Sequence, residues 1–180
     1  MTLLPKISGC ILKAGSRGTA GNMAVISDIV KSWRNPRAVI VQHLQSRATE
    51  PFAVSLLVAF LVLAFVAQWP NMSRSAYLQP DAPLTQRMLA AGLALLASIP
   101  LWYALAALSH VVARSFGGKG SYLGARLALF AALLSVAPLM LVQGMISGFA
   151  GPGLLTNGAR AFVLIGFLYL WLSMLIASES

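Results

Sequence analysis

Four long apolar runs limit what this chain of 180 residues can fold into. They are Pro51–Trp69, Met88 to about Val112, Leu127–Phe149 and Ala159–Ser178, and the last alone holds a charged residue, Arg160, near its start. Each run reaches the roughly 17–25 residues that a helix needs to cross a hydrocarbon core about 30 Å thick. We therefore expect an all-α membrane protein with four transmembrane helices over residues 51–178.

The overall composition excludes several classes of protein. Apolar residues make up 58% of the chain and charged residues only 9%, which is too few to cover the surface of a soluble fold. The net charge of +9 does not indicate a nucleic-acid partner, because the basic residues lie beside the apolar runs. Four acidic residues and a single cysteine, Cys10, offer no catalytic group, no cofactor site and no metal site. We expect a protein that is not an enzyme.

The lysines and arginines predict the orientation in the membrane. Ten of the 13 precede the first run or lie between the second and third runs, whereas Arg74 and Arg87 lie between the first two runs and Arg160 lies at the start of the fourth. Positive residues favour the cytoplasmic side. Both termini are therefore expected in the cytoplasm, with the chain in a bacterial inner membrane.

Two prolines and two glycines within the runs predict how the helices bend and pack. Pro100 and Pro138 are expected to bend spans, with Ser98 and Ser135 close enough to satisfy the freed carbonyls. Gly144 and Gly148 stand four residues apart, a spacing that lets two helices approach closely. We expect this pair to form a packing face inside the bundle.

The segment before the first run divides into two parts. Residues 1–22 predict a disordered leader that is dispensable, and translation could begin at Met1 or at Met23. Cys10 follows small residues as in a lipoprotein, but no apolar signal segment precedes it. Residues 23–48 predict two short amphipathic helices, the second opened by Asn35 as N-cap and Pro36.

The expected apolar faces of these two helices can be listed. They comprise Val25, Ile26, Ile29, Val30 and Trp33 in the first helix, and Ile40, Val41, Leu44 and Ala48 in the second, with His43 on the surface. Two alternatives remain open: the helices lie on the headgroup surface with Trp33 at the interface, or they pack on the end of the bundle.

A glycine-rich segment, Gly117–Gly118–Lys119–Gly120, joins the second and third runs. It lacks the serine or threonine that follows the lysine of a phosphate-binding Walker A loop, and apolar helices flank it. We expect a tight structural turn with glycines at positive φ, so that Gly118→Val destabilises the protein while Lys119→Ala is mild. Arg114, Lys119 and Arg126 would then contact anionic headgroups.

His110 is the one ionisable side chain well inside a predicted span. A second ligand is absent at the neighbouring helical positions, which argues against a metal site. Two roles remain: a hydrogen bond to a neighbouring helix or to the interface, or ligation of a haem or quinone.

The stretch from Ser109 to Ser121, followed by Ala131 to Pro138, resembles the Yip family of Rab-interacting membrane proteins, and more closely its short bacterial members. In that family a span turns through a glycine-rich loop into a span with a central proline. The resemblance implies a multi-pass membrane protein. Eukaryotic members have five spans and a long, often acidic N-terminal region, whereas this chain predicts four spans and a basic one, so Rab-type binding is not implied.

Three functions remain at this point. The favoured one is a membrane scaffold or accessory subunit that associates with other membrane proteins through helix–helix contacts in the lipid bilayer. The alternative is a small transporter or channel, indicated by the two prolines and Gln143. The third is a redox subunit that uses His110.

Overall fold

The computed structural model describes residues 29–47, 49–79, 81–115 and 117–179. These residues form helices and no strand: α2 (Pro36–Arg47), α3 (Glu50–Leu78), α4 (Leu84–Ala97), α5 (Ile99–Ser115), α6 (Tyr122–Ala150) and α7 (Leu154–Glu179). A helical segment at residues 29–34 precedes α2. Four helical stretches are long and apolar enough to cross a membrane, namely α3, α4 with α5, α6 and α7. The expected all-α fold with four spans is confirmed.

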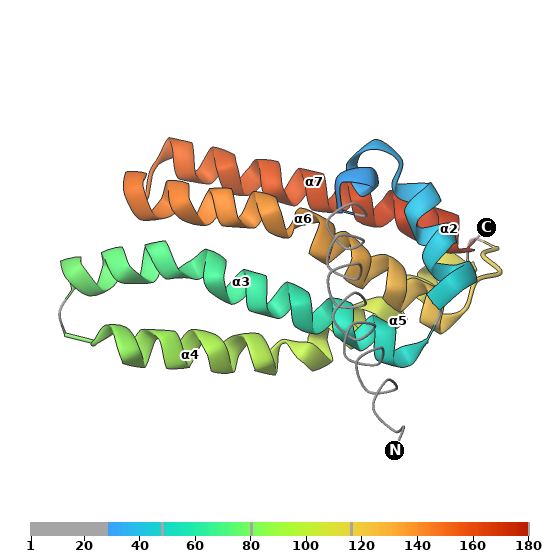
Figure 1. Cartoon of the computed structure of the whole chain (residues 1–180), viewed down its shortest axis with the longest axis horizontal. Coiled ribbons are helices and arrows are strands. Elements are labelled where there is room, and N and C mark those ends of the chain that lie inside the picture. The colour runs from blue at the N-terminus through green and yellow to red at the C-terminus, as the bar shows by residue number, and fades with distance from the viewer. Residues whose placement is uncertain (1–28, 48, 80, 116, 180) are drawn as a thin grey trace, which may run out of the picture.

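The long helices lie along the longest axis of the molecule, and α2 lies at one end of it (Figure 1). We call this end, where α5 and α7 finish, the α2 end, and the end with the α3–α4 and α6–α7 connections the opposite end. The third span, α6, is the centre of the bundle, since 67% of its most apolar 18-residue stretch is buried. Alanines, leucines and Phe130 of α6 pack there against Leu57 and Phe60 of α3 and against Leu170 and Met174 of α7.

Each helix extends beyond the apolar run that predicted it. The helix α3 continues nine residues past Trp69 to Leu78, and α6 begins at Tyr122 rather than Leu127. Helices of 29 residues are about 43 Å long, which matches the thickness of the hydrocarbon core together with the headgroup regions. The apolar runs therefore cover only part of each helix.

The second span stays helical through Ser98, which stands between α4 and α5 two residues before Pro100: the N–H of Ser98 donates to the carbonyl of Ala94, and the N–H of Trp102 donates to that of Ser98. Ser98 is the C-cap of α4. Its hydroxyl donates to the carbonyl of Leu95 at 2.6 Å and accepts a hydrogen bond from Nε1 of Trp102 at 3.0 Å. Pro138 stands inside the continuous helix α6, where the Oγ of Ser135 donates to the carbonyl of Ala131. Both prolines therefore stand within helical spans, each with a serine two or three residues earlier whose hydroxyl donates to a backbone carbonyl.

The helices before the first span pack on the α2 end of the bundle. Trp33 donates its indole N–H to the backbone carbonyl of Ser135 in α6 at 3.0 Å, and Ile40 of α2 is fully buried. Asn35 accepts a hydrogen bond from the backbone N–H of Ala38 and α2 starts at Pro36, which confirms the predicted N-cap. Of the two open alternatives, the structure shows packing on the bundle.

The buried face of this region differs from the predicted one. Ser32, Val39 and His43 are buried, whereas Val30 and Val41, which were expected on the apolar face, are exposed. The ring of His43 lies 5.2 Å from that of Phe52 in α3, so the prediction of a surface histidine was wrong. Contacts with α6 and α7, rather than local amphipathicity, select the face. Residues 23–28 and Ala48 lie outside the described part of the chain.

Candidate functional site

The glycine-rich turn closes α5 with a specific pair of backbone hydrogen bonds. The N–H of Gly117 donates to the carbonyl of Arg114, and the N–H of Gly118 donates to that of Ala113, both at 3.0 Å. This is the Schellman pattern, in which the first of the two residues takes a left-handed conformation. Gly117 has φ +89°, and neither Gly118 nor Gly120 has a positive φ. The expectation that Gly118 needs positive φ was therefore wrong, because the helix end assigns that conformation to Gly117.

We now predict that Gly117→Val destabilises the protein by about 1–3 kcal/mol, since a β-branched side chain is strained at positive φ. Gly118→Val should have a smaller effect, and Lys119→Ala should cost no more than about 1 kcal/mol. Thermal unfolding of the three purified variants in one detergent tests this order. Equal losses for Gly117→Val and Gly118→Val would contradict it.

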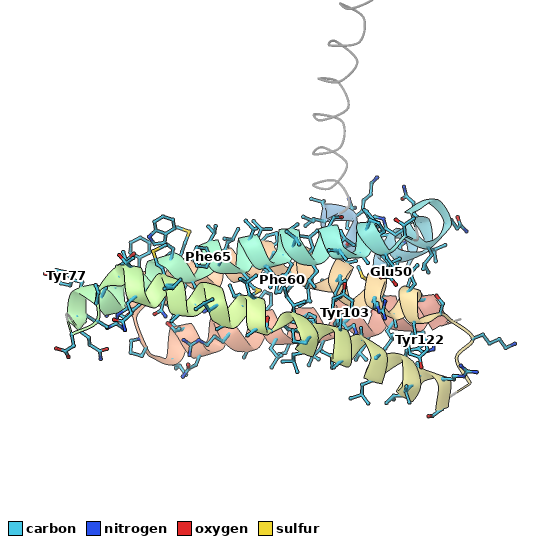
Figure 2. The ribbon with its side chains drawn as sticks, turned by 90° about the horizontal axis from the view of Figure 1, so that it is seen from below. Glu50, Phe60, Phe65, Tyr77, Tyr103 and Tyr122 are labelled. Atoms are coloured by element: carbon cyan, nitrogen blue, oxygen red, sulfur yellow. The ribbon has the colours of Figure 1, made fainter. Side chains whose placement is uncertain are left out.

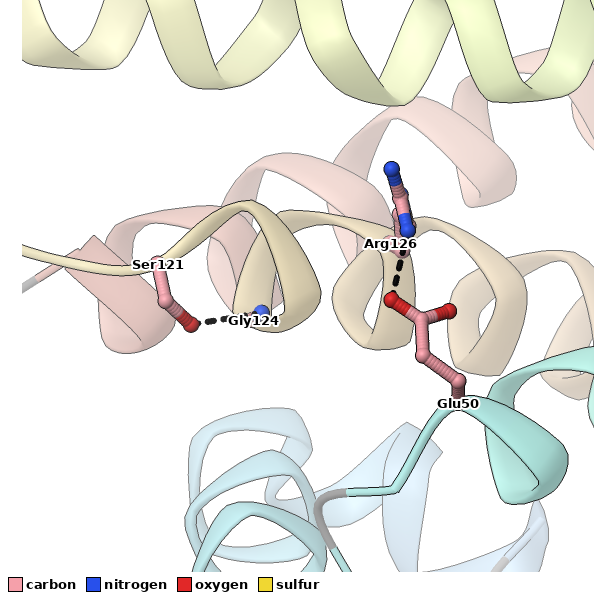
Figure 3. A network of polar contacts seen from close by, with 4 residues as sticks. All are labelled: Glu50, Ser121, Gly124 and Arg126. Atoms are coloured by element: carbon pink, nitrogen blue, oxygen red, sulfur yellow. Dashed lines mark hydrogen bonds and ion pairs between the residues drawn. The ribbon is translucent and has the colours of Figure 1, made fainter.

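After the turn, Ser121 caps α6 and an ion pair joins α6 to α3 (Figure 3). The hydroxyl of Ser121 accepts from the N–H of Gly124 at 3.1 Å. One turn further on, Nη1 of Arg126 lies 2.6 Å from Oε1 of Glu50, and the guanidinium carbon lies 5.3 Å from the ring centre of Tyr103. Arg126 thus contacts two neighbouring helices. Arg126 therefore has an acidic partner in α3, whereas Arg114 and Lys119 are exposed, and the headgroup contacts of the three stay predictions.

His110 lies in the same region, at the contact between α5 and α6. Its side chain is 2% exposed and its ring centre lies 4.1 Å from that of Tyr122, the first residue of α6. Glu50, Tyr103 and Tyr122 lie toward the α2 end of the bundle, while Tyr77 lies at the opposite end (Figure 2). His110 therefore packs beside the turn in a contact between two spans.

A groove of about 620 Å³ opens beside the turn, between α5 and α7. Gly117 and Gly118 form one end of it, and Ser109 and Trp171 also line it. Ser109 directs its hydroxyl to the carbonyl of Ala106 in its own helix, so its polar atom is already satisfied. The groove presents a mainly aliphatic surface to the outside of the bundle.

At the opposite end, Gly144 and Gly148 lie against the backbone of α3. A Cβ added to Gly144 would overlap the carbonyl oxygen of Ala67, and one added to Gly148 would lie 2.5 Å from Cβ of Pro70. The two glycines therefore occupy a contact inside the bundle, between the first and third spans. Pro70, which stands within α3, forms part of that contact.

Arg74 strengthens the same contact between α3 and α6. Its Nη1 donates to the carbonyls of Phe149 at 2.9 Å and Gly148 at 3.3 Å. These carbonyls belong to the last turn of α6, where no intrahelical donor remains and the helix dipole is negative. Gly151 follows with φ +72°, and its missing Cβ leaves room for the guanidinium. Because the sequence predicted the first span to end at Trp69, Arg74 was expected in a connection, where an arginine gives no signal for such a role.

The outer face of the second span carries a regular stripe of four alanines and one leucine. Positions spaced four and three residues apart are all exposed, namely Ala90, Ala94, Ala97, Leu101 and Ala104. In the most apolar 18-residue stretch of this span no residue is buried. The buried share of the corresponding stretch is 39% in α3 and 22% in α7. The described chain thus leaves one face of this span open, on which the alanines lie beside exposed leucines, Leu89, Leu93 and Leu96.

These features define a multi-pass helical membrane protein. The family model described as "Yip1 domain" matches residues 30–178, and the chain therefore belongs to the Yip1 domain family. The resemblance noted in the sequence is confirmed by this match. Neither the curated proteins nor the solved structures include a match to the chain.

Proposed function

We propose that this protein is a non-enzymatic scaffold or accessory subunit of the bacterial inner membrane that binds other membrane proteins through its second span. The proposal is supported by the exposed stripe from Ala90 to Ala104. It lies on the one span, among those that the structure describes, whose most apolar 18 residues include no buried residue. A repeat of four and three residues is the spacing of a helix–helix seam. Small residues let two backbones approach within a bilayer, where packing rather than hydrophobicity drives association.

Site-specific photocrosslinking in native membranes tests this proposal. A photoreactive residue in place of Ala94 should give discrete protein adducts, whereas one in place of Ala161, an exposed alanine of α7, should give lipid adducts. Introducing Ala97→Trp should remove the protein adducts, because the large ring would prevent close approach. Lipid adducts at both positions would contradict a partner at this face.

A small transporter or channel is the second candidate, and the prolines within two spans, Pro100 and Pro138, favour it together with Gln143, because transport sites often lie where spans bend. Such a protein must let water reach its interior. Cysteine introduced at Gln143 should then react with a water-soluble thiol reagent in reconstituted vesicles. The scaffold proposal expects no reaction there, and rapid labelling would favour transport.

We also predict that the α2 end faces the cytoplasm, as the distribution of Lys and Arg indicates. In a Cys10→Ser background, cysteines at Asp81 and Pro152 should react with an impermeant maleimide in cells whose outer membrane has been made permeable. Cysteine at Lys119 should react only after the inner membrane is opened. The reverse pattern would contradict the proposed orientation, and labelling of Asp81 without Pro152 would contradict four spans.

A further inference from the structure

A small cavity of about 290 Å³ lies between the helical segment at residues 29–34 and α2, and residues of both form its wall. Two basic residues, Lys31 and Arg34, line it together with the amide residues Asn35 and Gln42. Val30 adds an aliphatic part to the wall and is 61% exposed. The cavity therefore combines two positive charges, polar amides and apolar surface.

The segment that carries the two basic residues is held against two spans by Trp33. Its indole N–H donates to the carbonyl of Ser135 in α6, and a Cβ added to Gly166 of α7 would lie 3.0 Å from its Cη2. Ser135 stands about 20 Å along α6 from Tyr122 and belongs to the third apolar run. The cavity thus lies beside the membrane-spanning part of the bundle.

The two basic side chains have no anionic partner among the residues that the structure describes. Both are exposed, and neither forms an ion pair or a side-chain hydrogen bond there. Residues 29–47 include no Asp or Glu, Asp28 lies outside the described residues, and Glu50, which follows α2, is paired with Arg126. A cation beside hydrocarbon is costly unless an anion or water reaches it. An anionic ligand is therefore complementary to this cavity.

We propose that this cavity binds the phosphate of an anionic glycerophospholipid, with Arg34 and Lys31 contacting the phosphate oxygens. A guanidinium offers paired N–H donors that match a phosphate, and an ammonium adds a second charge. A free phosphate has the same chemistry. Exposed Val30 and the adjoining spans favour the lipid, because they give its acyl chains an apolar surface that a free phosphate would not use. This site is separate from the stripe from Ala90 to Ala104 and does not depend on it.

Mixed micelles of the full-length protein test the site. Phosphatidylglycerol or phosphatidylcholine with the same acyl chains is added, and the rise in Tm gives an apparent affinity. Phosphatidylglycerol should bind more tightly. Arg34→Gln should weaken that binding about 5-fold, from the energy of one cation near an anionic surface, and Lys31→Gln/Arg34→Gln about 30-fold. Neither variant should change the response to phosphatidylcholine.

Arg37→Gln is the matched control for Arg34→Gln. It removes the same charge from an exposed arginine three residues further along the chain that does not line the cavity, so it should leave the affinity nearly unchanged. Arg34→Lys retains the charge and should keep most of the binding. Because these side chains are exposed, the Tm without lipid should be the same in every variant, which verifies folding.

Soluble phosphates separate a lipid from a free phosphate at the same cavity. Inorganic phosphate and glycerol phosphate should not raise the Tm at concentrations well above those at which phosphatidylglycerol saturates.

Three results would overturn the lipid site. Equal weakening by Arg34→Gln and Arg37→Gln would indicate a diffuse attraction to the basic segment. Equal affinity for the two lipids would show that the cations do not select the headgroup, and a Tm rise with soluble phosphate that matches the rise with phosphatidylglycerol would exclude a role for the acyl chains.

Discussion

Replacing Gly144 with leucine should prevent the native contact between α3 and α6 and cause the largest loss of stability of any single change considered. The added Cβ would overlap the carbonyl oxygen of Ala67 and lie 2.9 Å from its carbon. These are backbone atoms of a helix, so they cannot rotate away as the end of a side chain can. Overpacking costs about 1–3 kcal/mol where side chains can adjust, and we expect about 3 kcal/mol or more here.

Thermal unfolding in detergent measures this loss, which corresponds to a fall in Tm of about 6–12 °C for a chain of this size. Gly158→Leu is the matched control. Gly158 also lies within a helix, α7, but no atom lies within 4 Å of its added Cβ. That change should be neutral or stabilising by up to about 0.8 kcal/mol, because leucine forms helices better than glycine. Similar losses in both variants would show that the close approach at Gly144 is absent.

Removing the guanidinium of Arg74 should give the second largest effect, a loss of about 1.5–3 kcal/mol, as expected for hydrogen bonds to a charged group. Arg74→Met retains most of the apolar stem but leaves the carbonyls of Gly148 and Phe149 without their donor. The last turn of α6 would then lose its contact with α3. Limited proteolysis at the opposite end, together with Tm, should detect the loosened contact.

Arg160→Met is the control for Arg74→Met. Arg160 is an exposed arginine of α7 in the half of the helix nearest the opposite end, so its removal changes the charge of that side by the same amount. Its effect on Tm should be within about 0.5 kcal/mol of zero, as for ordinary surface substitutions. If both arginine variants lose the same stability, the role of Arg74 is one of charge balance and not of capping.

The turn between the second and third spans is predictable from the sequence in its place but not in its backbone conformation. Its existence follows from three glycines between apolar runs, because glycine permits conformations closed to other residues. Which glycine needs that freedom depends on where α5 ends. Since the helix continues to Ser115, the left-handed position falls on Gly117 and not on Gly118. If the helix ended one residue later, the left-handed conformation would fall on Gly118, and the residue that must be glycine would change with it.

The helices before the first span show a different limit. Asn35 and Pro36 predicted the start of α2 correctly, because capping involves residues three apart. The buried face was predicted less well: Ser32 and His43 are buried and Val30 is exposed. A weak amphipathic pattern does not identify the surface that the helix covers. Trp33 reaches the carbonyl of Ser135, and a contact across 102 residues leaves no trace in local spacing.

The sequence by itself determined the class of protein, the four spans and the family, because transfer of a helix into lipid depends on its own residues and the Yip1 match depends on their order. Only the tertiary structure decided which side chains hold the spans together. Lipid is as apolar as the helix faces, so association depends on shape and on a few polar contacts rather than on hydrophobicity. Gly144 against Ala67, Arg74 on the end of α6, and Arg126 with Glu50 are such contacts. Each joins residues more than 70 positions apart, and their complementarity exists only once the helices lie side by side.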